Sequence, residues 1–297
     1  MARASASTLA AVALIGLLWG LNWPAVKTLL SEMPPITIRA VSLTVASILL
    51  GLWVWLRGDR LRPAPDETWP LVLAGLLTVF GFNILVTFGQ ILTETSRAAI
   101  IAYIMPALTA MLSVIFLGER LGPNRVLALV LAVTGVGVMA SENLAYLIAN
   151  PLGPLIMLGS AISWALGIVA SKARTWTLGP AAQAVWFLGT SALLCWPLVA
   201  LFEPVPAITT LSPTVLWVLA FHILGPMLLC YALWTTLVSR LPGSVAALAT
   251  LLAPVVAVSS SMALLGDAPT WQKLTALALI VASIALTFLR PLGHRTE

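Results

Sequence analysis

The apolar stretches of this sequence carry a small set of polar and aromatic residues that could bind an organic ligand. Aromatic rings can stack on such a ligand, while amide and hydroxyl groups can fix its polar ends. An unpaired amide is costly in an apolar environment, so Asn22 and Asn83 should face the protein interior. The residues that we predict to bind a ligand are Trp19, Asn22, Asn83, Tyr103, Trp164, His222, Tyr231 and Thr250. Taken singly, each of them could equally serve helix packing.

Residues that could perform catalysis are scarce. All ten Asp and Glu residues lie in loops or near the ends of apolar runs, and the two histidines are His222 and His294. The chain has no HExxH motif, no phosphate-binding loop and no paired acids inside an apolar run. We therefore expect no catalytic residue, no metal and no cofactor, which argues against a membrane-embedded enzyme and an ATP-driven pump. The sequence also lacks the ring of charge that is typical of a channel.

Three basic residues near or inside apolar runs allow two interpretations. His222 could be a neutral histidine that is hydrogen-bonded between helices, or it could contact substrate or carry a proton. Lys27 and Arg39 lie near helix ends and could extend toward the lipid headgroups. Alternatively, Arg39 faces a cavity and attracts a substrate carboxylate, or it pairs with Glu32.

The overall composition places the chain in a membrane. Hydrophobic residues make up 60% of the 297 residues and charged residues 8%, whereas a soluble domain has about 25% charged residues. The net charge of +5 comes from basic residues that are scattered singly, so we expect no nucleic-acid partner. The expected partners are the lipid bilayer and a small-molecule substrate, and we expect a monomer.

Ten apolar runs are long enough to cross the bilayer as helices of about 20 residues. They are continuous rather than alternating, which favours helices over a β-barrel. The sequence therefore predicts an all-α integral membrane protein. The predicted spans are 7–29, 35–56, 69–91, 96–117, 123–141, 152–172, 182–202, 213–237, 243–265 and 270–290.

The basic residues of the loops predict the orientation. Eleven Lys and Arg residues fall on the side of the N-terminus, and two, Arg97 and Lys273, fall on the opposite side. Positive loop charge favours the cytoplasmic side of a membrane. Both termini are therefore expected in the cytoplasm.

The chain contains a weak internal repeat. Residues 96–119 and 244–267 share seven identities in 24 positions, among them Pro106 with Pro254 and Gly118 with Gly266. A second alignment pairs Trp19 with Trp164. These matches divide the chain into halves of five spans, residues 1–146 and 147–297. Because five is odd, the second half is inverted relative to the first, as in many secondary transporters.

This pattern of two five-helix repeats, each with a proline in its fourth helix followed by Gly-Glu or Gly-Asp, resembles the EamA branch of the drug/metabolite transporter superfamily. Within that branch it looks most like the YddG-type aromatic amino-acid exporters of bacteria. The resemblance implies a central cavity and export of small metabolites across the bacterial inner membrane by alternating access, with amino acids, aromatic ones above all, as the favoured substrates. Other metabolites or drugs are the alternative within the superfamily, and a lipid-modifying enzyme is the alternative outside it.

The two repeated prolines are candidate hinges. A proline removes one backbone hydrogen bond and kinks a helix, so Pro106 and Pro254 could each let half a helix swing. The alternative is a static kink that only shapes packing. Gly118 should end the helix that contains Pro106.

Overall fold

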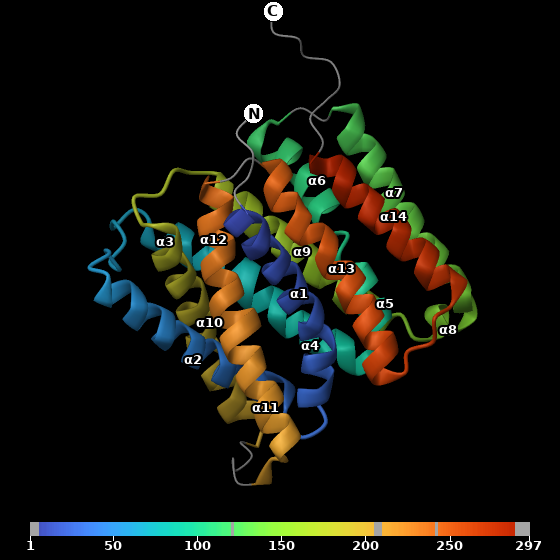
Figure 1. The fold of residues 1–297 in the computed structure, drawn as a ribbon, viewed down its shortest axis with the longest axis horizontal. Coiled ribbons are helices and arrows are strands. Elements are labelled where there is room, and N and C mark those ends of the chain that lie inside the picture. Colours follow the sequence, from blue (N-terminus) through green and yellow to red (C-terminus); the bar gives the residue numbers. More distant parts are fainter. Residues whose placement is uncertain (1–5, 120–121, 205–209, 241–242, 289–297) are drawn as a thin grey trace, which may run out of the picture.

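The computed structural model of the protein describes residues 6–119, 122–204, 210–240 and 243–288, and the regular elements within them are helices (Figure 1). The α-helices are α1 (Ala6–Leu29), α2 (Pro35–Leu56), α3 (Thr68–Gly75), α4 (Phe82–Leu92), α5 (Thr95–Ala102), α6 (Met105–Leu117), α7 (Pro123–Ala140), α8 (Leu144–Ala149), α9 (Leu152–Lys172), α10 (Pro180–Phe202), α11 (Pro213–His222), α12 (Cys230–Arg240), α13 (Gly243–Leu265) and α14 (Trp271–Phe288). The described residues also include two π-helices, η1 (Leu76–Gly81) and η4 (Ile223–Leu229), and the 3-10 helix η2 (Ser141–Asn143).

Seven helical segments are long and apolar enough to cross a membrane. They are Ala10–Leu29, Pro35–Leu56, Thr68–Leu92, Thr95–Leu117, Leu152–Lys172, Pro180–Phe202 and Pro213–Thr235, and each corresponds to a span predicted from the sequence. The other three predicted spans contain shorter apolar helices, Val126–Ala140, Leu252–Leu265 and Trp271–Leu286. The chain is therefore an all-helical membrane protein with several apolar spans.

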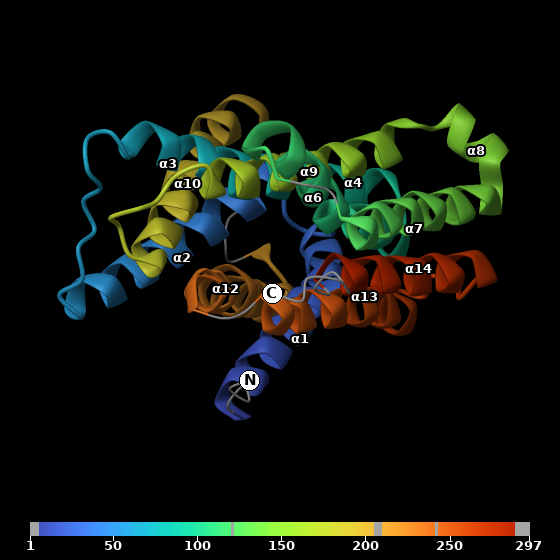
Figure 2. The same ribbon diagram turned by 90° about the horizontal axis from the view of Figure 1, so that it is seen from above.

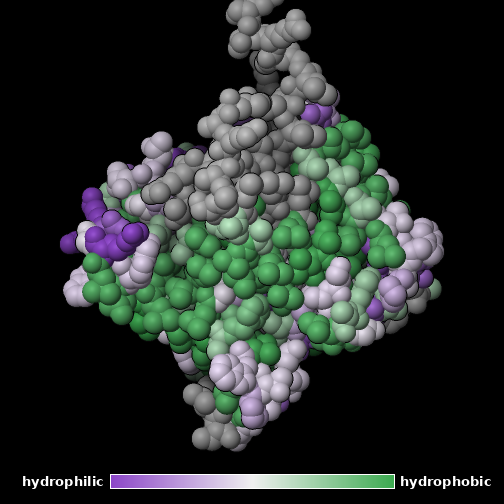
Figure 3. Space-filling view, in the orientation of Figure 1, coloured by the Kyte–Doolittle hydropathy of each residue, from purple (hydrophilic) through white to green (hydrophobic). Residues whose placement is uncertain are grey.

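The surface of the molecule suits a bilayer. Hydrophobic side chains form a broad band across the middle of the face seen in Figure 3, and hydrophilic residues gather toward its edges. Several tryptophans near helix ends are more than half exposed, namely Trp55, Trp69, Trp217 and Trp271. Indole rings at helix ends suit the boundary between lipid tails and water.

The helices pack in pairs that are distant in the sequence. Helix α1 lies along α13, α2 along α10, and α7 along α14 (Figures 1 and 2). The first of these pairs is close because Gly20 in α1 faces α13, where an added Cβ would lie 2.4 Å from the Cβ of Val256. Small residues of this kind let helix backbones approach in a membrane. The start of α1 and the end of α14 lie at the same end of the molecule (Figure 1).

Two of the predicted spans are interrupted by π-helices. Residues 68–92 run through α3, η1 and α4, and residues 213–240 run through α11, η4 and α12. A π-helix has a wider turn, and its carbonyls need partners from elsewhere in an apolar environment. The Ser163 hydroxyl on α9 donates to the Leu77 carbonyl over 2.7 Å, and the Trp19 indole on α1 donates to the Pro226 carbonyl over 3.3 Å. Each π-helix is thus held by a side chain from a neighbouring helix.

The predicted continuous span 96–117 is broken in the structure. Helix α5 ends at Ala102 and α6 begins at Met105, so the interruption falls at Tyr103 and Ile104, ahead of Pro106. Pro106 occupies the first turn of α6, where a missing backbone N–H costs little. Pro254, by contrast, lies inside the continuous helix α13. The two prolines therefore occupy different local structures, and a hinge role for either of them stays a prediction.

The helices that contain Pro106 and Pro254 both end at a glycine. Gly118 follows α6 with a φ of 67°, and Gly266 follows α13 with a φ of 75°. This left-handed conformation is typical of a glycine at a helix C-terminus. The prediction that Gly118 ends its helix is confirmed.

Carboxylates satisfy backbone N–H groups at or near several helix starts. Asp267 accepts from the Ser96 N–H in the first turn of α5 over 2.7 Å, and Glu32 accepts from the Ser212 N–H before α11, also over 2.7 Å. The bonds from Ser212 hold the pKa of Glu32 below its usual value. Glu203 accepts from the N–H groups of Ile36 and Thr37 at the start of α2. Negative charge at a helix N-terminus is favourable because the unpaired N–H groups there carry partial positive charge.

Candidate functional site

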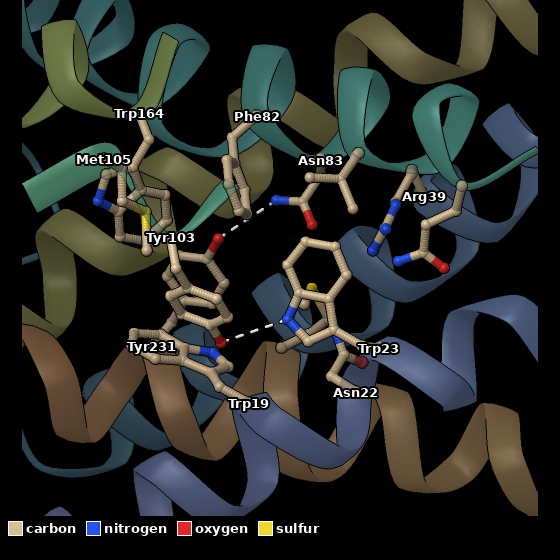
Figure 4. A pocket seen from close by; sticks show the side chains of 13 residues that line it. Trp19, Asn22, Trp23, Arg39, Phe82, Asn83, Tyr103, Met105, Trp164 and Tyr231 are labelled. Carbon is tan, nitrogen blue, oxygen red and sulfur yellow. Dashed lines mark hydrogen bonds between the residues drawn. The ribbon is translucent and has the colours of Figure 1, made fainter. Parts of the chain in front are cut away.

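A cavity lies in the bundle, where α1, α2, α4, α9, η4 and α12 approach the break between α5 and α6 (Figure 4). Its volume of about 50 Å³ exceeds the ~15 Å³ that one water molecule needs. The side chains that line it are Trp19, Asn22, Trp23, Arg39, Phe82, Asn83, Val86, Gln90, Tyr103, Met105, Trp164, Met227 and Tyr231. Aromatic rings and polar groups therefore converge on one space between the helices.

Most of the residues predicted to bind a ligand meet in this cavity. Six of the eight line it, namely Trp19, Asn22, Asn83, Tyr103, Trp164 and Tyr231. His222 lies next to it, in contact with two lining residues. Thr250 belongs to α13, but its side chain is outside the described part of the chain. That these residues bind substrate stays a prediction.

Aromatic rings form one wall of the cavity. The Trp19 ring meets the rings of Trp164 and Tyr231 edge-on, with centroids 6.1 and 6.0 Å apart, and Phe82 lies 4.9 Å from Trp164 in the same geometry. Edge-to-face pairs of this kind stabilise a fixed arrangement of rings. These four rings all line the cavity and form a largely apolar surface that a ligand could contact.

Hydrogen bonds fix the two tyrosines. The Asn83 amide donates to the Tyr231 hydroxyl over 3.2 Å and to the Val79 carbonyl over 2.8 Å. The Trp23 indole donates to the Tyr103 hydroxyl over 3.3 Å (Figure 4). The offset of 148 residues between 96–119 and 244–267 also aligns Asn83 with Tyr231, so this hydrogen bond joins matching positions of the internal repeat.

A chain of polar groups leads from Arg39 to Asn22. The Arg39 guanidinium donates from Nε to the Thr87 hydroxyl over 2.7 Å and lies 3.3 Å from Nε2 of His222. On the other side of the ring, Nδ1 of His222 lies 2.6 Å from Oδ1 of Asn22. A guanidinium can only donate, so Nε2 of His222 accepts and Nδ1 carries the proton that it donates to Asn22. His222 is therefore a neutral imidazole that orients Arg39, and its ring does not line the cavity.

Several lining residues were not predicted from the sequence. Phe82, Val86, Met105 and Met227 are apolar, and nothing in a membrane sequence separates a cavity-lining apolar residue from one that faces lipid. Gln90 carried the same signal as Asn83, since it is an amide in an apolar run. Trp23 lies four residues after Trp19, on the same face of α1. Arg39 was considered for the cavity only as one of several alternatives.

Comparison with known proteins decides the family. The EamA-like transporter family matches the chain twice, over residues 6–141 and 151–289. The chain belongs to the EamA-like transporter family. Its curated relatives are named as transporters, exporters or efflux pumps and not as enzymes.

Individual relatives of this EamA-like protein align over nearly its whole length. The uncharacterized transporter YvbV of Bacillus subtilis is 29% identical and aligns over 93% of this chain and 89% of its own. A probable terminal-alkyne amino-acid exporter of Streptantibioticus cattleyicolor is 26% identical over 94% and 92% of the two chains. A probable amino-acid metabolite efflux pump of Escherichia coli is 25% identical over 92% and 90%.

A solved crystal structure has the same fold. It superimposes with a TM-score of 0.70 at 23% identity and covers 95% of this chain and 96% of its own. The helical arrangement is therefore one that occurs in a solved protein.

Proposed function

We propose that this EamA-like protein is a secondary transporter that exports amino acids, with a preference for aromatic ones. The observation that carries the proposal is the chemistry of the cavity, whose lining combines aromatic rings with amide groups, tyrosine hydroxyls and the Arg39 guanidinium. An amino acid with a ring side chain has the matching halves. The names of the exporter from S. cattleyicolor and the efflux pump from E. coli agree with this substrate class.

The proposed architecture is ten membrane spans in two inverted repeats, residues 1–146 and 147–297, around the cavity. Three features support it. The third and eighth spans each contain a π-helix, the fourth and ninth each end on a left-handed glycine, and Asn83 and Tyr231 meet from matching positions. Two halves related in this way can open one site to either side of the membrane in turn.

The proposed location is the bacterial inner membrane, with both termini in the cytoplasm. Eleven basic residues on the terminal side against two on the other support this orientation. Cysteine labelling of Arg3→Cys and Trp271→Cys in intact cells with an impermeant reagent tests it. Labelling of Arg3→Cys without permeabilisation would reverse the orientation.

In the proposed transport cycle, the fourth and ninth spans bend. The fourth span is broken at Tyr103 and Ile104, whereas the ninth is continuous through Pro254, so the two halves differ in the way expected of alternating access. Pro106→Ala would let α5 and α6 join into one helix, because alanine restores the missing N–H and removes the ring clash. Transport should then fall more than the unfolding temperature. If this variant transports as fast as the wild type, Pro106 is not required for the transport cycle.

The test of the substrate class is counterflow of radiolabelled amino acids in proteoliposomes with purified protein. Phenylalanine and tryptophan should exchange faster than leucine, and sugars and nucleosides should not exchange. Trp19→Leu should lower kcat/KM for phenylalanine about 10-fold or more, because it removes ring contacts at the substrate. Trp55→Leu is the matched control, since Trp55 lies at an exposed helix end. Failure of every amino acid to exchange would overturn the proposal and favour another metabolite or a drug.

A further inference from the structure

Arg39 is a charged side chain in the interior of the protein whose polar partners are all neutral. Its relative exposure is 1%, yet it lies on α2 as part of the cavity lining. In the described ranges its hydrogen-bond partners are the Thr87 hydroxyl and the His222 ring, and none of the ion pairs there includes it. Burying an ion without a counter-ion costs several kcal/mol of folding free energy. Such an ion is therefore a candidate for a functional role.

The carboxylates that could neutralise Arg39 are engaged elsewhere. Glu203, which follows α10, accepts hydrogen bonds at the start of α2. Its donors are the Ile36 N–H over 2.8 Å, the Thr37 N–H over 2.7 Å and the Thr37 hydroxyl over 2.9 Å. Glu32, which the sequence suggested as a partner, accepts from Ser212 N–H instead. The predicted pairing of Arg39 with Glu32 is therefore not formed.

The donors of Arg39 are only partly used. A guanidinium has five N–H groups, and the two contacts above occupy Nε and one position on Nη1. The neutral His222 ring accepts from Nη1 of Arg39, and its own Nδ1–H is fixed on Asn22. The remaining donors belong to a side chain that is part of the cavity wall. In Figure 4 the guanidinium lies at the end of the cavity opposite the Trp164 ring.

A second polar side chain of the cavity has an atom without a partner. The Gln90 side chain lines the same cavity, is 1% exposed, and its Oε1 has no hydrogen-bond partner within the described part of the chain. The backbone of Gln90 is fixed, since its carbonyl accepts from the Lys27 ammonium over 2.6 Å. An amide with an unused hydrogen-bonding atom, in the same cavity as a guanidinium, is suited to the charged end of a zwitterion.

We propose that Arg39 is the carboxylate-binding residue of the cavity, so that the transporter selects substrates that bear a carboxylate and rejects the corresponding amides and amines. The substrate supplies the counter-ion through two N–H donors of one guanidinium, a geometry that favours arginine over lysine. Gln90 accepts from the ammonium group of the same substrate. This inference rests on the proposed transport function and adds to it the chemical group that a substrate must carry.

The experiment compares ligands that differ only in the carboxylate. Exchange of radiolabelled phenylalanine in proteoliposomes is measured against unlabelled phenylalanine, phenylalaninamide and phenethylamine as competitors. A hydrogen-bonded charge contributes about 1.5–3 kcal/mol, so the amide and the amine should compete about 10- to 100-fold more weakly than phenylalanine. Arg39→Gln should bring the three competitors to within about 3-fold of one another, and Arg39→Lys should retain part of the discrimination.

Arg174→Gln is the matched control. Arg174 makes an ion pair with Asp66 outside the cavity, over 2.6 Å, so its loss should leave the order of the competitors unchanged. A second measurement keeps the test independent of transport by the variants. Phenylalanine, but not phenylalaninamide, should raise the unfolding temperature of the detergent-solubilised wild-type protein, and this difference should vanish in Arg39→Gln.

The outcomes separate the two proposals. If the wild-type protein exchanges amino acids but the amide competes as well as phenylalanine, the role of Arg39 is overturned and the transport function stands. If no amino acid exchanges, the proposed function fails. The role of Arg39 then also fails unless other carboxylates in a panel stabilise the wild-type protein and not Arg39→Gln.

Discussion

Arg39 and Lys273 are two buried cations in very different surroundings. The Lys273 ammonium is fully buried near the start of α14, 2.6 Å from the Glu94 carboxylate and 3.0 Å from the Ala268 carbonyl. The Arg39 guanidinium is equally buried, but its partners are a hydroxyl and a neutral imidazole. Lys273 is thus paired with a carboxylate of the chain, and Arg39 is not. The difference fits a structural role for Lys273 and supports the proposal that Arg39 binds the carboxylate of a substrate.

The largest expected effect separates transport from stability at Arg39. Arg39→Gln should lower kcat/KM for a carboxylate substrate by about 10- to 100-fold, because the charge-assisted hydrogen bonds to the substrate are lost. The unfolding temperature should change little, since the change removes an uncompensated buried charge. Counterflow kinetics and thermal unfolding of the same preparation measure both quantities. A variant that unfolds readily and transports normally once folded would make Arg39 a structural residue like Lys273.

The opposite result is expected at Lys273. Lys273→Gln should lower the free energy of unfolding by about 1–2 kcal/mol, a value below that of a fully buried pair because Glu94 is 44% exposed. Transport per folded molecule should stay within about 3-fold of the wild type, since Lys273 does not line the cavity. Thermal unfolding of Lys273→Gln, Glu94→Gln and the double variant forms a cycle that isolates the pair. Additive effects would show that the ion pair contributes nothing.

A smaller effect is expected for His222, which contacts Arg39 as a neutral ring. Because the acidic residues lie in loops or near helix ends and His222 is neutral, exchange should proceed without an imposed pH gradient. Adding a gradient of one pH unit should change the initial rate less than about 2-fold. Flux measured with and without the gradient checks this. Strict dependence on the gradient that disappears in His222→Ala would instead give His222 a role in carrying a proton.

The smallest expected effect concerns Glu67, a carboxylate that is hydrogen-bonded within the protein, and the pH dependence of stability. Glu67, before α3, accepts from the Thr177 N–H, which holds the pKa of Glu67 below its usual value of about 4.5. A lowered pKa in the folded state means that the unfolded state binds the proton first as pH falls. The contribution of Glu67 is therefore present above about pH 4.5 and is lost at lower pH.

Thermal unfolding between pH 7 and pH 3.5 should therefore show a weaker pH dependence in Glu67→Gln than in the wild type. Thr177→Val removes only the hydroxyl bond to Glu67 and should have an intermediate effect. Transport near neutral pH should not change in either variant. Identical acid dependence of the three proteins would show that Glu67 does not link pH to stability.

Much of the fold could be predicted because a membrane span depends on a simple property, a long apolar run. Seven of the ten predicted spans correspond to long apolar helices in the structure. Pro106 indicated a kink in the fourth span but not the full break at Tyr103, and the π-helices η1 and η4 could not be predicted from an apolar pattern that is the same on both sides of each of them. They depend on tertiary contacts, such as the Ser163 hydroxyl on Leu77 and the Trp19 indole on Pro226.

Cavity residues could be predicted where their polar side chains are unfavourable in contact with lipid. Asn22, Asn83 and Tyr231 face the interior because their polar groups need partners there. The position of Arg39 in the cavity depends on how α2 is rotated, and a residue so near a helix start could equally have reached the headgroups. Met227 and Phe82 give no signal at all, since apolar side chains are common on both faces of a membrane helix.

The π-helix η1 has a consequence for the register of everything that follows it. An α-helix advances about 100° per residue, so one residue more or less within a turn rotates the rest of the helix by that angle. Asn83 and Gln90 both lie in α4, which follows η1 directly, and both line the cavity. Deleting one residue from Leu76–Gly81 would turn both amides away from Arg39 and Tyr231 while leaving every lining residue in the sequence. The polar side of the cavity thus depends on how η1 rotates α4 about its axis, as well as on which side chains α4 carries.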